Sequence, residues 1–370
     1  MIYLDYAATT PADPRVIEEF INAEQKYYGN PLSAHDIGRI ALCELEKASA
    51  QMSEILSLSG CEIIFTSSTS EANNLAIKGF AQTNKHIGKH ILSTCLEHPS
   101  VSGTLAYLKE NGFEIELIKI KPTGKIDLDY LASVIRKDTI LLAISAIDSE
   151  LGIIQPIEDI HNVLEKTNCK LFVDAAQAMG KIQYSSNWGD LHIDLLTFTP
   201  HKFYGLKGIG ILVKRNNIVI EPMIHGGGIS LYRSGTPSVP LILACLKALQ
   251  LAKINFTERI NHVSKIKNYL IESLKDIKGI NLNSPICSSP FILNLSLSKF
   301  KGIEMQKKLN AMGIAVSVKS ACSVAGTPSR PVLAITGSKK IALSSWRLSF
   351  SHLTTFEEID TLIAVIRECL

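Results

Sequence analysis

The middle of the chain alternates short apolar runs with longer amphipathic ones. Seven runs rich in β-branched residues have the length of buried strands; they are CEIIFTSS (61–68), HILSTC (90–95), FEIELIKI (113–120), TILLAISAI (139–147), KLFVDAA (170–176), DLLTFT (194–199) and GIGILVKR (208–215). Four stretches with helical spacing lie between them, at 70–82, 99–112, 127–137 and 156–167. This alternation predicts an α/β fold with a mainly parallel seven-stranded sheet and helices on both faces.

A second pattern begins after the sheet. A long helical stretch, at about 238–277, is followed by mixed elements; these are the strand patterns 290–297, 314–318 and 344–350 and the helical patterns 302–313 and 355–369. They predict a smaller α+β domain, with the long helix as the joint. We place the large domain at 16–250 and form the small domain from 1–15 and 251–370.

Composition narrows the class of protein. Of 370 residues, 46% are hydrophobic and 20% are charged, as in ordinary soluble globular proteins. A net charge of +3 without a Lys/Arg cluster argues against a nucleic-acid partner. The start of the chain has no signal-peptide pattern. The most apolar helical stretch, 241–252, contains Lys247 and is too short for a bilayer, so no membrane partner is expected.

The cysteines and histidines argue against a disulfide framework and a metal site. The eight cysteines are scattered and form no C-x-x-C motif; they stand at positions 43, 61, 95, 169, 245, 287, 322 and 369. This usage fits a reducing, cytoplasmic location. His86 and His90 are four residues apart but lack a third ligand, so no zinc site is predicted.

Polar residues follow the predicted strands, where ligands bind in parallel sheets. KLFVDAAQ carries Asp174 and Gln177, and DLLTFTPHK ends in Thr199, His201 and Lys202. A carboxylate there suits a cation or a donor, although a helix N-cap is an equally ordinary role. A lysine there is available to condense with an aldehyde if it is desolvated, whereas the ordinary alternative is a solvated side chain.

Two further strand ends add an anion site and an imidazole. The hydroxyls at 67–70 precede a helix, so they suit either an anion or a simple N-cap. His98 precedes Pro99 and by itself is as compatible with a structural role. An anion cradle, an imidazole, a carboxylate and an amine at one sheet edge are what pyridoxal 5′-phosphate (PLP) requires.

Motifs along nearly the whole chain support this interpretation. They are YLDYAATTPADPRV, YGNPLSAHDIGR, FTSSTSEANNLAIKG, EHPSV, GIIQPI, VDAAQAMGKI, HKFYGLKGIG, RSGT, SACS and LTTFEEID. In these motifs the chain resembles the NifS/IscS-like cysteine desulfurases of the class V aminotransferase family. The resemblance implies a fold type I PLP-dependent transferase, with a large PLP-binding domain and a small domain that carries a catalytic cysteine loop.

The resemblance also assigns roles to single positions. Lys202 would be the Schiff-base lysine and a proton shuttle, and Asp174 would pair with the pyridinium nitrogen. Gln177 would hydrogen-bond the phenolic oxygen, and His98 would stack on the ring and act in acid–base steps. The phosphate would be held by Thr69, Ser70, Thr199 and His201. Thr236, in RSGT, would reach the phosphate of a neighbouring subunit, which implies a homodimer with shared active sites.

Cys322 lies in SVKSACSVAGTPSRP, whose small residues are typical of a loop, although a buried structural cysteine is the ordinary alternative. The resemblance makes Cys322 the nucleophile that takes sulfur from L-cysteine as a persulfide, leaving L-alanine. The long loop suits delivery to a sulfur-acceptor protein, for iron–sulfur cluster assembly or for tRNA or cofactor thiolation. Arg347 would bind the substrate carboxylate, unless it forms a surface ion pair.

Two of the departures from the family pattern bear on the substrate and on a partner. Ser149 stands where an asparagine would contact the cofactor and the substrate carboxylate, and Asp148 is expected to add negative charge beside it. The chain stops at Leu370, so the C-terminal extension with which some members dock a scaffold protein is expected to be missing. A selenocysteine lyase, a related PLP β-lyase and a catalytically weak regulatory homologue remain alternatives.

Overall fold

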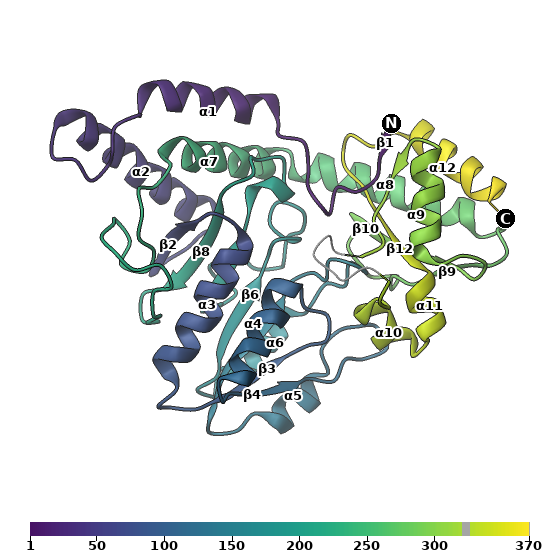
Figure 1. The fold of residues 1–370 in the computed structure, drawn as a ribbon, viewed down its shortest axis with the longest axis horizontal. Helices are drawn as coiled ribbons and strands as arrows, with labels where there is room; N and C mark the ends of the chain where they lie inside the picture. Colours follow the sequence, from purple (N-terminus) through teal and green to yellow (C-terminus); the bar gives the residue numbers. More distant parts are fainter. Residues whose placement is uncertain (320–325, 370) are drawn as a thin grey trace.

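The protein is built around a sheet of seven strands (Figure 1). The computed structural model describes residues 1–319 and 326–369. The strands lie in the order β2-β8-β7-β6-β5-β3-β4. Their bounds are Cys61–Thr66 (β2), His90–Ser93 (β3), Glu114–Leu117 (β4), Thr139–Ser145 (β5), Lys170–Asp174 (β6), Leu195–Phe198 (β7) and Gly210–Arg215 (β8). The seven predicted strands are therefore confirmed.

Strand direction decides which residues meet at one edge. Strand β8 is antiparallel to both of its neighbours, β7 and β2, and the other neighbouring pairs are parallel. Six of the seven strands thus point the same way. Because the carboxyl ends of parallel strands share an edge, the polar residues that follow these strands are brought together there.

Helices cover both faces of the sheet because its central strands are apolar on both sides. Phe172 faces a core formed with α3 and α4, whereas Leu171 and Val173 face a core formed with α1, α2, α5, α6 and α7. The bounds of these helices are Pro14–Lys26 (α1), Asp36–Ile55 (α2), Thr69–Asn84 (α3), Pro99–Glu110 (α4), Leu128–Val134 (α5), Ile157–Leu164 (α6) and Val239–Ile254 (α7). In Figure 1, α1 runs alongside α7 at one side of the molecule.

The long helix predicted at 238–277 is wrong in one respect, since it is two helices. Helix α7 ends at Ile254, and α8 (Phe256–Leu274) continues at an angle of 68°. Asn255 marks the break, because its side-chain Nδ2 donates to the Leu251 carbonyl at 2.9 Å and so satisfies an acceptor at the end of α7. Within the described residues, no single helix has the length and hydropathy to cross a membrane; only this bent pair together passes that test.

A separate apolar core lies beyond the sheet edge. It combines Leu4 from the N-terminus with α8 and the later elements, and Trp346 is fully buried within it. Those elements are β9 (Ile280–Leu282), β10 (Ile292–Leu297), α9 (Gly302–Ala311), β11 (Ile314–Ala315), β12 (Ser345–Ser349) and α12 (Phe356–Glu368). Strand β1 (Ile2–Tyr3) pairs with β11, which ties the N-terminus to this core. The exact domain boundaries stay predictions.

Candidate active site

A cavity of about 220 Å³ lies at the carboxyl edge of the sheet. We call it the active-site cavity. Its walls come from five strand ends, the N-terminal segment and β12, and they comprise Ala7, Ala8, Ser68, Thr69, Ser70, His98, Ser100, Ser145, Ile147, Ser149, Asp174, Ala176, Gln177, Thr199, His201, Lys202 and Arg347. The structure therefore brings together every site residue predicted from the sequence except Thr236 and Cys322.

Lys202 reaches the cavity because β7 ends in a tight turn. The strand stops at Phe198, and a 3₁₀ turn over Pro200–Lys202 redirects the chain. The Lys202 Nζ donates to the Ala7 and Ala8 carbonyls, at 2.8 Å each. Lys202 is thus held against the N-terminal segment and is only partly exposed, which argues against a fully solvated side chain.

Asp174 lies at the end of β6 and is only 5% exposed. Its Oδ2 accepts from the Asn73 Nδ2 at 2.9 Å, and its Oδ1 accepts from the Ala176 backbone N–H at 2.9 Å. Asn73 is itself fully buried and accepts from the Thr197 hydroxyl. Sequence reasoning missed Asn73, although a buried amide among apolar residues of a helix was the available signal.

The start of α3 and the end of β7 form the anion-binding side of the cavity. The Thr69 Oγ1 is buried and has no hydrogen-bond partner among the described residues, which is costly unless a ligand supplies one. Ser70 lies beside it at the helix N-terminus, where backbone N–H groups favour an anion. Burial lowers the pKa of His201 to about 4, and Lys202 and nearby lysines act in the same direction, so the neutral ring is favoured.

His98 is held by the helix that follows it. Its Nδ1 accepts from the Ser100 backbone N–H at 3.1 Å, and the Ser100 Oγ lies 2.8 Å from the same nitrogen. Because Nδ1 acts as an acceptor, the proton of the neutral ring is on Nε2. Burial lowers the pKa of His98, which again favours the neutral ring, while Asp174 opposes that shift.

Arg347, on β12, closes the cavity from the smaller core. Its side chain is almost completely buried, so the alternative of a surface ion pair is excluded. One terminal nitrogen donates to the Asp5 carboxylate at 2.8 Å, and the other donates to the Ser149 carbonyl at 2.8 Å. Its Nε has no hydrogen-bond partner in the part of the chain that the structure describes. The guanidinium is therefore fixed in place with unused donor capacity.

Burial weakens the negative charge expected from Asp148. Asp148 does not line the cavity, and its Oδ2 accepts from the backbone N–H groups of Glu150 and Leu151. Burial and the neighbouring Glu150 raise the pKa of Asp148 to about 7, although the N–H donors oppose that shift. A large share of this carboxyl is therefore neutral near pH 7. Ser149 does line the cavity, as predicted.

Two predicted site residues, Thr236 and Cys322, are not among those that line the active-site cavity. Thr236 lines a second cavity, of about 430 Å³, which it shares with Ser67 and Gly235. It therefore does not face the active-site cavity of its own chain. Cys322 lies outside the described residues.

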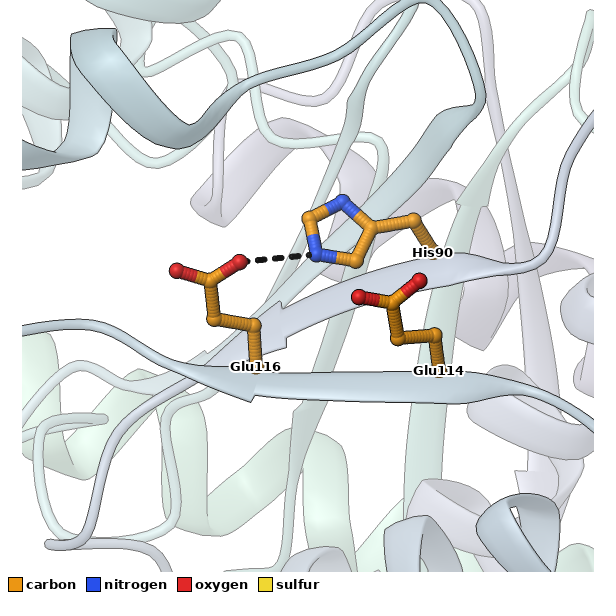
Figure 2. Close-up of side chains that lie close together, drawn as sticks. All are labelled: His90, Glu114 and Glu116. Carbon is orange, nitrogen blue, oxygen red and sulfur yellow. Dashed lines mark hydrogen bonds and ion pairs between the residues drawn. The ribbon is translucent and has the colours of Figure 1, made fainter.

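A cluster at the opposite end of the sheet resembles a metal site in composition. Figure 2 shows His90, Glu114 and Glu116 side by side on β3 and β4. Each already has a protein partner: the His90 ring nitrogens contact Thr139 and Glu116, and Glu114 forms a two-pronged ion pair with Arg136. We interpret the cluster as a hydrogen-bond network that ties down the edge strand β4.

Comparison with known proteins agrees with this architecture. The family model for aminotransferase class-V matches residues 2–362. The chain belongs to this family. Cysteine desulfurase IscS of Buchnera aphidicola subsp. Baizongia pistaciae (strain Bp) is 38% identical over 377 residues, covering 100% of this chain and 92% of that protein.

Solved structures of similar sequence also have this fold. A NifS-like protein superposes with a TM-score of 0.92 at 34% identity, over 100% of this chain and 98% of that chain. A structure described as SspA in complex with cysteine gives a TM-score of 0.81 at 31% identity, over 96% of this chain and 100% of that chain. The mainly parallel α/β sheet is thus the sheet of the class-V family.

Proposed function

We propose that this class-V protein is a PLP-dependent cysteine desulfurase that converts L-cysteine to L-alanine and transfers the sulfur to Cys322 as a persulfide. The observation that carries the proposal is the convergence of Lys202, Asp174 and Thr69 on one cavity. The curated relative named as a cysteine desulfurase, which matches the whole chain, supports it.

The residues of the cavity fit PLP. The unpartnered Thr69 hydroxyl and the N-terminus of α3 suit a phosphate, which carries only acceptors when fully ionised. We assign Ser70, Thr199 and His201 to the same phosphate. Asp174, oriented by Asn73, would pair with the ring nitrogen at the other end.

Three side chains complete the assignment. Lys202 would hold PLP covalently through Nζ, which its contacts with two backbone carbonyls already keep inside the cavity. Gln177 would donate to the phenolic oxygen. His98 would stack on the ring, because its imidazole lines the cavity and its Nδ1 is held by Ser100.

The chemistry divides between the cofactor and the chain. When bound, PLP withdraws electrons from the substrate Cα and so allows the C–S bond to break. Lys202 moves protons at that carbon, and neutral His98 is suited to exchange a proton with the substrate. Arg347, with its guanidinium fixed by Asp5, binds the substrate carboxylate and orients the amino acid.

Cys322 receives the sulfur in this proposal. Its thiolate forms a new S–S bond with the substrate sulfur while the C–S bond of the substrate breaks, and protons then complete L-alanine. A similar solved structure is described as SspA in complex with cysteine, which supports cysteine as the substrate of this chain. We also propose that the persulfide passes to an acceptor protein for iron–sulfur cluster assembly, and that the protein works in a reducing, cytoplasmic environment.

The test measures alanine and the mass of the Cys322 peptide after the PLP-loaded protein is given L-cysteine without added thiol. Lys202→Ala is expected to lose the visible absorption of the bound cofactor. Cys322→Ala is expected to keep that absorption and form no persulfide. Cys287→Ala, at an exposed cysteine, is the matched control and is expected to react like the parent. Parent-rate alanine release by Cys322→Ala would contradict the mechanism.

A further inference from the structure

A second lysine lies directly behind the active-site cavity. Lys181 follows Gln177 by four residues and is 5% exposed, and it does not line the cavity. Its Nζ donates to the Gln177 Oε1 at 3.0 Å and lies 5.9 Å from the centre of the Phe291 ring. Over residues 1–319 and 326–369, no carboxylate lies within ion-pair distance of this ammonium.

Burying an ammonium that has one hydrogen-bond acceptor lowers the stability of the folded protein. Desolvation of an unpaired cation costs several kcal/mol, and an apolar side chain of the same volume would avoid that cost. Burial lowers the pKa of Lys181 to about 7, and the charges of Lys202 and Arg347 act in the same direction. The position therefore calls for a role other than packing.

The contacts of Gln177 show what Lys181 does to it. The Gln177 Nε2 donates to the Ala7 carbonyl at 2.8 Å, while its Oε1 accepts from Lys181. The Ala7 carbonyl can only accept, and below its pKa of about 7 the Lys181 ammonium can only donate. A flipped carboxamide would place two donors together and two acceptors together, so this orientation is enforced from both sides. The second Nε2 hydrogen is then left to serve the cavity that Gln177 lines.

We propose that Lys181 is a positioning residue, whose ammonium fixes the Gln177 carboxamide so that an amide N–H, and not the carbonyl, is presented to the phenolic oxygen of PLP. The inference rests on the proposed function, since it requires PLP in the active-site cavity. An anionic phenolic oxygen accepts hydrogen bonds and is repelled by a carbonyl. Lys181 thereby selects the orientation of Gln177 that favours binding of the cofactor.

Loss of Lys181 has a predictable spectroscopic effect. Held from the Ala7 side only, the carboxamide would present its N–H to the phenolic oxygen for less of the time, so the negative charge there would depend more on a proton held at the Lys202 nitrogen. That proton is then held more tightly, so the pH midpoint at which the visible absorption changes is expected to rise by about one pH unit. The dissociation constant for PLP is expected to rise about tenfold, the size of one hydrogen bond to a charged group.

The experiment compares Lys181→Met with the parent by titrating the visible absorption of the PLP-loaded protein with pH. Methionine has a similar volume but no donor. The matched control is Lys267→Met, at another lysine that is 5% exposed, whose Nζ donates to Ser288 and Ser289 in the smaller core. The control is expected to keep the parent midpoint. An unchanged midpoint in Lys181→Met would overturn the proposal.

A double variant separates positioning from a direct effect of charge. In a Gln177→Ala background the carboxamide is gone, so Lys181→Met is expected to shift the midpoint by less than half as much as in the parent. A shift of half or more in that background would mean that Lys181 acts through its charge alone, which also overturns the proposal. Lys181→Arg, which can only donate, is expected to restore a midpoint near that of the parent.

Folding and PLP binding are checked separately. If Lys181→Met is not folded, as judged by circular dichroism, Lys181→Leu takes its place in both comparisons. Parent protein that shows no visible absorption with PLP would refute the proposed function itself. Parent protein with normal absorption and an unmoved midpoint in the variants would refute only the role of Lys181.

Discussion

Arg347 illustrates how a single side chain is prepared for a ligand. Its side chain is almost completely buried, and within residues 1–319 and 326–369 it donates to one carboxylate, Asp5, and to one carbonyl, from Ser149. Among the same residues the Nε has no hydrogen-bond partner. A planar guanidinium that is fixed in this way can bind a carboxylate with two parallel hydrogen bonds, which the ammonium of a lysine cannot do.

Arg347→Lys is therefore expected to raise the KM for L-cysteine about 10- to 100-fold, the value of a hydrogen bond to a charged group, and to change kcat less. Steady-state kinetics with L-cysteine checks this. Arg367→Lys, at an exposed arginine on α12, serves as the control and is expected to match the parent. A loss confined to kcat would argue against a role in holding the substrate carboxylate.

At the scale of elements, the anion-binding turn depends on a close approach between β8 and the start of α3. Gly210 opens β8, and a Cβ added there would lie 2.2 Å from the Ser68 carbonyl carbon and 2.4 Å from its oxygen. These are backbone atoms, so the turn itself would have to move. The antiparallel strand thus supports the turn that carries Thr69 and Ser70.

Gly210→Ala is expected to lower the stability by about 1–3 kcal/mol through overpacking and to weaken PLP binding by displacing the N-terminus of α3. Thermal unfolding and titration of apo protein with PLP measure the two effects. Gly103→Ala is the control, because a Cβ at that exposed position of α4 meets no described residue within 4 Å. It is expected to stabilise the protein by about 0.5–1 kcal/mol, since alanine favours a helix. Unchanged PLP affinity in Gly210→Ala would show that the turn is not strained.

At the scale of the whole molecule, the position of Thr236 is relevant to the oligomeric state of the protein. It lines a cavity outside the active site of its own chain. Apolar side chains lie exposed on the loop that precedes it, among them Ile229 and Leu231, the latter 86% exposed. Exposed apolar groups of this kind are typical of protein interfaces. We therefore propose a homodimer in which Thr236 serves the phosphate of the partner subunit.

Mixing two inactive or weakened variants tests this arrangement. Lys202→Ala keeps a normal Thr236, and Thr236→Ala keeps a normal Lys202. In a mixed dimer one site then has both residues, so random mixing is expected to give about a quarter of the parent activity, from one site in half of the dimers. No gain over the unmixed variants, or a mass of one chain in solution, would contradict shared sites. Parent protein carried through the same mixing is the control.

Local sequence patterns explain which elements of the fold could be predicted from the sequence alone. The strands were predictable because buried parallel strands are continuous apolar runs, as in Thr139–Ser145. The residues after those strands were predictable as neighbours because parallel strands end at one edge. The break at Asn255 was not predictable, because a helical pattern continues across it and the 68° angle is seen only in the folded chain.

The sequence by itself determined the class of fold, the chemical groups at the sheet edge and the family. The tertiary structure alone decided how those groups are held: Asn73 reaches Asp174 across 101 residues, Asp5 reaches Arg347 across 342, and Lys181 and Ala7 together fix the carboxamide of Gln177. The physical reason is the sequence separation over which each kind of interaction acts. Side-chain periodicity and strand ends are properties of short segments, whereas a hydrogen bond between distant residues exists only once both cores have packed.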